Sequence, residues 1–214
     1  MDPPADAVPA LQQLGRRMVQ LRGELTREQA RRHALAFTPD RDGLIAADLA
    51  ANIRHLQKRI KSLRQAAAEL AAREPDLALH VERLCSVPGI GQVSALRLLG
   101  ELLVLPAHLK AKQWVAHAGL DPRPRQSGAT DAPRHISRTG NRHLRLALFM
   151  PTLVALRRSP QIKAAYESLL ARGKKKKVAI IAIMRRLLHA SWGMLHHQQD
   201  FNPQLFPASP LPNS

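Results

Sequence analysis

The sequence predicts a mainly α-helical protein: a long antiparallel helical hairpin, or coiled coil, followed by a compact helical domain. Apolar residues recur at three- and four-residue spacing over two long runs near the N-terminus. Shorter runs with the same spacing follow, separated by breaks that contain proline or glycine. No run alternates in the manner of a half-buried strand, and the 214 residues suffice for one or two domains.

Two long helices are expected first, after a disordered lead over residues 1–9. The first helix is predicted over 11–36 and the second over 44–72, with the break between them at 37–43. The apolar stripe of the second helix runs from Ile45 to Leu63. We expect the hairpin to occupy residues 10–75, with the stripes forming its own core or a coiled coil with a second copy of the chain.

The compact domain is expected over residues 76–200, before a disordered, proline-rich tail over 201–214. Its helices are predicted over 77–84, 92–103, 110–118, 142–156, 161–170 and 178–196. Trp114 is interpreted as a core anchor and Gly119 as a helix cap. Residues 120–139 are predicted to be a structureless loop, and a loop of that length in a compact domain is typically functional or disordered.

Positive charge is concentrated in the C-terminal half of the chain. The net charge is +17, and residues 102–199 hold 18 Lys and Arg but only three acidic residues. Such a block attracts polyanions, most simply nucleic acid. An anionic membrane is disfavoured because no basic segment forms a long amphipathic helix with aromatic residues on its apolar face.

Composition excludes several other classes of protein. Cys85 is the only cysteine, so neither a disulfide framework nor a cysteine zinc cluster is possible, and the scattered histidines do not predict a metal site. Aromatic residues make up 3% of the chain, which argues against a base-stacking single-strand binder. The N-terminus does not resemble a signal peptide, and the apolar run from Val178 to Met184 is too short to span a bilayer. We expect a cytoplasmic, nucleoid-associated protein with no membrane partner.

The turn Val87-Pro88-Gly89-Ile90-Gly91-Gln92 joins two apolar helices. Gly89 and Gly91 can adopt positive φ and leave bare N–H groups at the start of the helix near Gln92, where a phosphate oxygen could bind. The turn therefore resembles a helix-hairpin-helix, which grips a nucleic-acid backbone without reading bases. The alternative is a tight structural turn inside a helical bundle.

The loop after residue 120 is rich in arginine around a single Ser-Gly. Because the guanidinium fork matches phosphate oxygens, this loop is a candidate phosphate site. The basic helix that opens after Gly140 and the lysine turn before the last helix extend the same charge. The predicted nucleic-acid contacts are Gly89, Gly91, Gln92, Arg123, Arg125, Arg134, Arg138, Asn141, Arg142, Arg145, Lys174, Lys175, Lys176 and Lys177.

Several motifs occur in an order that resembles one known family. The Val-Pro-Gly-Ile-Gly turn is followed by Ala118-Gly119-Leu120-Asp121-Pro122, by Gln126-Ser127-Gly128, and by Ile136-Ser137-Arg138-Thr139-Gly140-Asn141-Arg142. Together, over about residues 84–195, they resemble the C-terminal domain of insertion-sequence transposases of the IS110 and IS116 type. The helical hairpin is similar to the coiled coil that precedes this domain in the family.

The resemblance implies DNA transposition by phosphoryl transfer. Ser127 matches the family's nucleophile: its Oγ would attack a DNA phosphorus and displace a sugar hydroxyl, which conserves the bond in a phosphoserine linkage. Arg123, Arg125, Arg138 and Arg142 would neutralise the phosphoryl oxygens. The resemblance also implies a guide RNA, assembly as a multimer, and an RNase-H-like domain whose four acidic residues hold Mg²⁺.

This sequence departs from the family pattern at its N-terminus. Only Asp2 and Asp6 precede the hairpin, so we expect an N-terminally truncated chain that binds no cofactor alone and transfers strands only when another protein supplies the metal domain. Two alternatives stay open: a non-catalytic helix-hairpin-helix module that binds DNA, and a basic structural protein that binds RNA.

Overall fold

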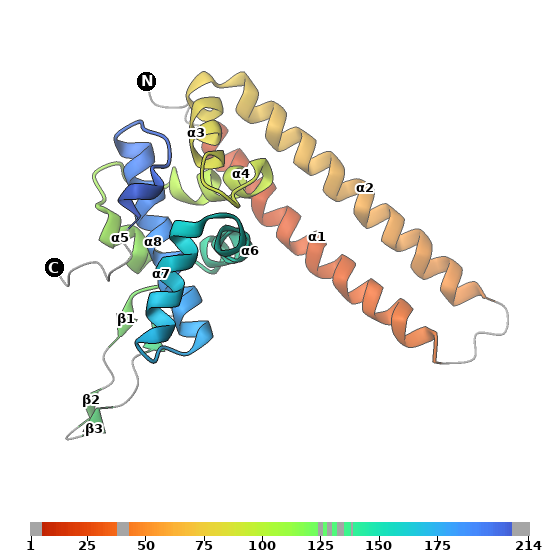
Figure 1. Cartoon of the computed structure of the whole chain (residues 1–214). Coiled ribbons are helices and arrows are strands. Elements are labelled where there is room, and N and C mark those ends of the chain that lie inside the picture. Colours follow the sequence, from red (N-terminus) through yellow and green to blue (C-terminus); the bar gives the residue numbers. More distant parts are fainter. Residues whose placement is uncertain are drawn as a thin grey trace.

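The computed structural model describes residues 6–37, 43–123, 126–127, 130–131, 135–137 and 139–206. Most of these residues are helical, which confirms the mainly α-helical prediction (Figure 1). The α-helices are α1 (Ala7–Leu35), α2 (Leu44–Arg73), α3 (Pro75–Cys85), α4 (Gln92–Leu102), α5 (Ala111–His117), α6 (Arg142–Arg158), α7 (Pro160–Ala171) and α8 (Lys176–His196). A short 3-10 helix, η1, covers Pro203–Leu205.

Helices α1 and α2 form an arm that projects from a compact body built from the remaining helices (Figure 1). Along the arm, Leu21 and Leu25 of α1 pack against Ile53, Leu56 and Ile60 of α2. These residues belong to the apolar stripes that the sequence shows at helical spacing. The arm therefore has its own narrow core, separate from the core of the body.

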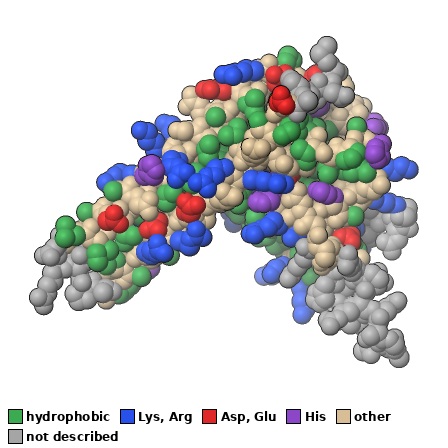
Figure 2. Space-filling view, turned by 180° about the vertical axis from the view of Figure 1, so that it is seen from behind, with side chains coloured by type: hydrophobic (Ala, Val, Ile, Leu, Met, Phe, Trp, Pro, Cys, Tyr) green, Lys and Arg blue, Asp and Glu red, His purple; other side chains and the backbone are tan. Residues whose placement is uncertain are grey.

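The root of the arm is docked tightly onto α4. A Cβ atom added at Gly100 of α4 would lie 2.9 Å from the Cα atom of Gln12 in α1, so a larger residue would push the two helices apart. On the reverse face, Lys, Arg and His side chains gather where the arm meets the body (Figure 2). The close contact makes the orientation of the arm part of the fold.

Helix α8 runs through the body and packs against α3, α5, α6 and α7. Ala179, Ile183 and Leu188 are fully buried in the body core. By length and composition alone α8 could cross a bilayer, and neighbouring helices bury 44% of its apolar window here. It serves as the central helix of the body.

Both ends of the described chain are more ordered than the sequence suggests. Helix α1 begins at Ala7, and Ala7 and Val8 are buried in the body core. At the other end, the N–H of Phe201 donates to Ser86 Oγ at 2.8 Å, and Phe206 is also buried. The expected disorder is therefore wrong for residues 7–9 and 201–206, whereas residues 1–5 and 207–214 lie outside the described part.

Within residues 120–139, where a structureless loop was expected, the described residues form two short antiparallel ladders, and we call this segment the ribbon. Strand β1 (Pro122–Arg123) pairs antiparallel with β4 (His135–Ile136), and β2 (Gln126–Ser127) pairs antiparallel with β3 (Thr130–Asp131). The strands are two residues long, too short to show alternation in the sequence. The ribbon extends away from the helical body (Figure 1).

Candidate nucleic-acid interface

The ribbon carries the predicted nucleophile on its outer ladder. Ser127 lies on β2, where its backbone pairs with Thr130 of β3. Arg123 lies on β1, opposite His135 of β4. The predicted contacts Arg125, Arg134 and Arg138 lie outside the described residues. The backbone of Ser127, on β2, thus lies apart from the helical body (Figure 1).

The root of the ribbon is fastened to the end of α5. Ser137 Oγ donates to Asp121 Oδ1 at 2.6 Å, and the Ser137 N–H donates to the Asp121 carbonyl at 3.0 Å. Gly119 caps α5 with φ of 63°, as predicted, and the Leu120 N–H donates to the Val115 carbonyl at 3.1 Å. These contacts hold the ribbon in a defined direction relative to the helices.

Two of the predicted nucleic-acid contacts, Asn141 and Arg145, form hydrogen bonds within the protein. Asn141 caps α6: its side chain accepts from the N–H groups of His143 and Leu144. Arg145 Nη1 donates to the carbonyls of Ala118 and Gly140, at 2.8 and 3.0 Å. The two side chains therefore shape the root of the ribbon, and their assignment as nucleic-acid contacts stays a prediction.

Arg142 and Lys177 both lie at the root of the ribbon. Both line a hollow of about 340 Å³, with Arg142 coming from the start of α6 and Lys177 from the start of α8. Leu120, which precedes β1, and Ile136 of β4 line the same hollow. The fold thus brings together two predicted cations that are 35 positions apart in the sequence, beside the segment that carries Ser127.

The lysine turn lies at the N-terminus of α8. Gly173 adopts φ of 77°, and the Lys174 N–H donates to the Leu169 carbonyl at 3.1 Å, which ends α7 and turns the chain sharply. All four lysines, Lys174–Lys177, are exposed, and the first turn of α8 has no acidic residue. Positive side chains at the positive end of a helix dipole are unfavourable, and a bound phosphate would relieve this repulsion.

A second hollow, of about 840 Å³, borders the other residues of the ribbon root, Asp121 and Pro122. Arg185 and His189 of α8 line it. Burial lowers the pKa of His189, and the nearby charges of Arg185 and Lys112 lower it further. Cationic groups therefore line both hollows that border the ribbon.

The two glycines of the turn between α3 and α4 have different roles. Gly89 has φ of 107°, and an added Cβ atom would lie 2.6 Å from the Pro151 carbonyl oxygen in α6. Gly91 has extended backbone, with φ of −91°, and no atom lies within 4 Å of its Cβ position. Gly89 is thus a packing residue, whereas Gly91 and Gln92 are exposed at the N-terminus of α4. The expectation of positive φ holds for Gly89 and is wrong for Gly91.

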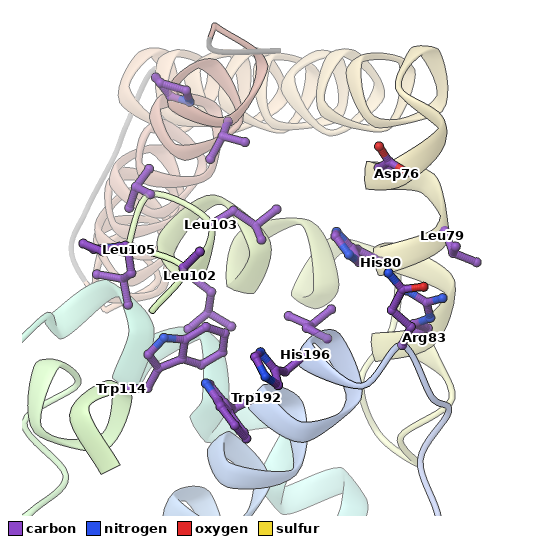
Figure 3. Close-up of a pocket in the computed structure, with 17 residues that line it drawn as sticks. Asp76, Leu79, His80, Arg83, Leu102, Leu103, Leu105, Trp114, Trp192 and His196 are labelled. Atoms are coloured by element: carbon purple, nitrogen blue, oxygen red, sulfur yellow. The ribbon is translucent and has the colours of Figure 1, made fainter. Parts of the chain in front are cut away.

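A third cavity, of about 660 Å³, lies between α3, the segment after α4 and the end of α8 (Figure 3). His80 and Arg83 come from α3, and Trp192 and His196 from α8. Trp192 Nε1 donates to the Leu109 carbonyl at 2.8 Å, and its ring stacks on His196. None of the predicted site residues lines this cavity. The contacts of Trp192 hold α8 against the segment after α4, so we interpret the cavity as a structural feature.

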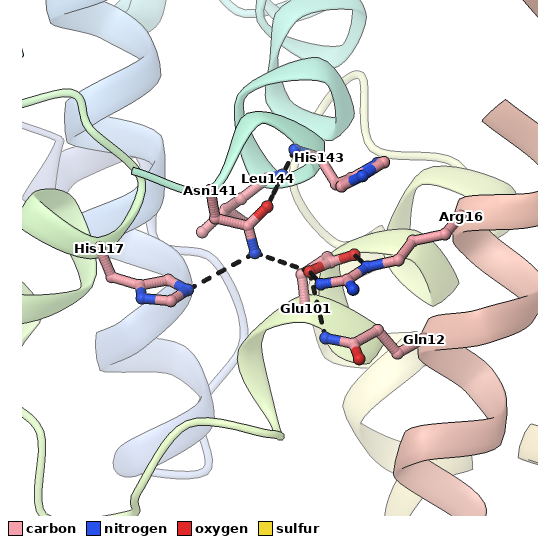
Figure 4. Close-up of polar contacts among 7 residues, drawn as sticks. All are labelled: Gln12, Arg16, Glu101, His117, Asn141, His143 and Leu144. Carbon is pink, nitrogen blue, oxygen red and sulfur yellow. Dashed lines mark hydrogen bonds and ion pairs between the residues drawn. The ribbon is translucent and has the colours of Figure 1, made fainter. Parts of the chain in front are cut away.

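Sequence reasoning missed the carboxylate at the centre of the molecule, Glu101 of α4, which is 3% exposed (Figure 4). Arg16 of α1 donates to it twice, at 2.8 and 2.9 Å. Gln12 donates at 3.2 Å and Asn141 at 2.6 Å. Burial alone would raise the pKa of Glu101, but the hydrogen bonds from Arg16 and Asn141 and the charges of Arg16 and His143 hold it below its ordinary value. Glu101 thereby connects the arm, α4 and the ribbon root.

The residues that the structure describes do not fit a magnesium site, because no three His, Cys, Asp or Glu side chains among them lie close enough together to hold a metal ion. A two-metal phosphoryl-transfer site needs several converging carboxylates. No step of the chemistry is therefore assigned here to a metal bound by these residues.

Comparison with known proteins identifies a family domain within this fold. Residues 81–167 match the model of the Transposase IS116/IS110/IS902 family. This range begins in α3, contains the glycine turn, Glu101, the ribbon and Asn141, and ends in α7. The arm and the lysine turn lie outside the matched range.

Curated relatives extend the similarity into the arm. The chain is 31% identical over 189 residues to a pilin gene-inverting protein of Moraxella lacunata, which covers 85% of the chain and 55% of that relative. It is 29% identical over 159 residues to an IS116 protein of Streptomyces clavuligerus, covering 74% of the chain and 39% of the relative. It is 30% identical over 128 residues to an IS900 protein of Mycobacterium paratuberculosis, and this match covers 58% of the chain and 31% of the relative. The chain spans about half the length of the first of these relatives, and its match to the IS116/IS110/IS902 transposase family covers residues 81–167.

Proposed function

We propose that this chain binds DNA and acts in DNA transposition or inversion by serine-dependent phosphoryl transfer. The single observation that carries the proposal is the placement of Ser127 on a ribbon whose root is flanked by cations from α6 and α8. A phosphate backbone held by Arg142 and the lysine turn would run beside the ribbon. The family domain and the pilin gene-inverting relative support the same kind of reaction.

In the proposed reaction, Ser127 Oγ attacks a backbone phosphorus. The Oγ–P bond forms as the bond from phosphorus to the leaving sugar oxygen breaks; the seryl proton is lost and the sugar oxygen gains one. Because an unassisted serine hydroxyl is a weak nucleophile, the reaction needs charge stabilisation around the phosphoryl oxygens. The family resemblance pairs this domain with an acidic, magnesium-binding domain, so we expect strand transfer to require that domain from another source.

The first prediction is a covalent protein–DNA adduct that depends on Ser127. The chain is incubated with DNA carrying the element's ends and Mg²⁺, with and without guide RNA and a separately produced RNase-H-like domain, and resolved on a denaturing gel. Ser127→Ala should abolish the adduct. Thr130→Val is the matched control, because Thr130 is the hydroxyl residue that pairs with Ser127 in the ladder and it should be dispensable. Equal adduct from the wild type and Ser127→Ala would refute the serine mechanism.

A complete absence of adduct with the wild type, combined with salt-sensitive binding, would favour the non-catalytic alternative. The exposed N-terminus of α4 at Gly91 and Gln92 is the feature that supports a helix-hairpin-helix contact. Tighter binding of folded RNA, with no preference for DNA ends, would instead favour an RNA-binding structural protein.

The second prediction concerns the lysine turn. Replacing Lys174–Lys177 with glutamine should weaken DNA binding and reduce the slope of log K against log salt by about one for each lost phosphate contact. The measurement is fluorescence anisotropy of a labelled duplex over a salt series. A control with Arg54, Lys58, Lys61 and Arg64 of α2 replaced by glutamine removes the same charge from exposed positions on the arm. Equal slopes in both variants would mean that the lysine turn is only a solvated surface.

The third prediction concerns assembly through the arm. Large apolar side chains are exposed near its tip: Phe37 is 79% exposed and Leu44 71% exposed. Because exposed apolar groups clustered at one place favour association, we propose that the tip joins copies of the chain. Phe37→Ser with Leu44→Ser should lower the mass found by light scattering. Phe149→Ser, at an exposed apolar position of α6, should leave it unchanged, and the reverse pattern would contradict assembly through the tip.

A further inference from the structure

A band of cationic side chains crosses the junction between the arm and the body. We define the junction band as three arginines: Arg22 of α1, Arg97 of α4 and Arg142 of α6. The Cγ atom of Arg97 would lie 3.6 Å from a Cβ atom added at Gly15, so Arg97 packs directly on α1. Arg97 and His143 line the same small hollow. Figure 2 shows basic side chains gathered over this junction.

The charges in the junction band repel one another. Burial lowers the pKa of the Arg97 guanidinium, Glu101 acts in the opposite direction, and the charge of Arg22 lowers it further. Burial also lowers the pKa of His143; Glu101 opposes this effect, while the charges of Arg16, Arg142 and Arg97 add to it. Three separate elements therefore bring like charges within electrostatic range of each other.

Within the described residues, Glu101 opposes this repulsion only in part. Among the ion pairs of the described residues, none involves Arg22, Arg97 or Arg142. Glu101, the nearby carboxylate, already accepts hydrogen bonds from Arg16, Gln12 and Asn141. In addition, His143 Nδ1 is buried with no hydrogen-bond partner among the described residues. A polyanion would supply the missing negative charge.

The band shares Arg142 with the ribbon-root surface that we propose for DNA. Arg142 belongs both to the junction band and to the hollow that Lys177 lines at the ribbon root. The tight docking of α1 onto α4 at Gly100 fixes the arm side of the band relative to the body side. A row of cations fixed on rigid elements suits the regularly spaced phosphates of a double helix.

We propose that the junction band is a second phosphate-contact surface, which holds the backbone of a double helix in the angle between arm and body. This inference rests on the proposed nucleic-acid function and adds Arg22 and Arg97, which the sequence did not single out, to the predicted contact Arg142. The contacts are to phosphates rather than to bases, so they should be independent of sequence and strongly dependent on salt.

The test is a salt series with the full chain and two labelled probes, a DNA duplex and a folded RNA hairpin. Arg22→Gln with Arg97→Gln removes the two members of the band that lie outside the ribbon-root surface and should reduce the salt slope by about two. Arg54→Gln with Lys58→Gln is the matched control, because both are exposed cations of α2 outside the band, and its slope should match the wild type. Arg97→Met, which keeps an apolar stem, should also weaken binding.

The results separate this inference from the proposed function. A reduced slope in the band variant but not in the control supports the band, and the probe with the larger reduction identifies DNA or RNA as the occupant. A slope equal to that of the wild type or of the control on both probes overturns the band. If the lysine-turn variant still loses binding in that case, the proposed nucleic-acid function stands and only the second surface is lost.

Discussion

Gly89→Ala should unfold the protein or lower its free energy of unfolding by about 3–5 kcal/mol, from left-handed strain and overpacking together. Gly89 has φ of 107°, a conformation that L-residues with a Cβ atom rarely adopt. The added Cβ atom would also lie 2.6 Å from the Pro151 carbonyl oxygen and 2.7 Å from the Ala155 nitrogen. Both are backbone atoms of α6, which cannot move without shifting the helix. Urea unfolding followed by circular dichroism measures the loss.

Gly91→Ala is the matched control for this prediction. Gly91 is only two positions away but is exposed, extended and free of neighbours at its Cβ position. A change of less than about 1 kcal/mol is expected there, with a slight gain possible because alanine restricts the unfolded chain. If both variants unfolded at the same urea concentration, the packing of the turn against α6 would be wrong. DNA binding by folded Gly91→Ala also tests the α4 N-terminus, since the added methyl group partly covers its N–H groups.

Glu101→Gln should lower the free energy of unfolding by roughly 3 kcal/mol, the range for breaking a buried charged network. The substitution keeps the size of the side chain but removes the charge that Arg16 pairs with at 2.8 Å. The amide nitrogen would also face the donors of Gln12 and Asn141. Glu24→Gln is the control, because Glu24 lies 3.9 Å from Arg17 on an exposed surface, where an ion pair contributes less than about 1 kcal/mol.

The pH dependence of the free energy of unfolding provides a second test of the contribution of Glu101 to stability. Because folding lowers the pKa of Glu101 below its ordinary value of 4.5, its ionised form stabilises the fold fully above that value. This contribution is lost as the pH falls through the lower pKa of the folded state. Between pH 5 and pH 3 the wild type should therefore lose more stability than Glu101→Gln. Parallel curves for the two proteins would show that folding does not lower the pKa of Glu101.

Local signals in the sequence account for most helix boundaries. Pro75 and Pro160 occupy first-turn positions of α3 and α7, where the missing N–H costs nothing. Gly119 and Gly173 end α5 and α7 in left-handed conformations. Each signal acts within one turn of the chain, so it can be recognised without knowledge of the fold. The ribbon escaped prediction because its two-residue strands carry no periodicity.

The sequence by itself determined the helical class, the basic C-terminal half and the ordered motifs, including Ser127, that resemble a transposase domain. Only the tertiary structure decided which polar residues act together. Glu101 meets Arg16 across 85 positions and Asn141 across 40, and Arg22, Arg97 and Arg142 converge from three helices. Such pairings depend on how helices dock, and docking is set by close packing at positions such as Gly89 and Gly100 rather than by any local pattern.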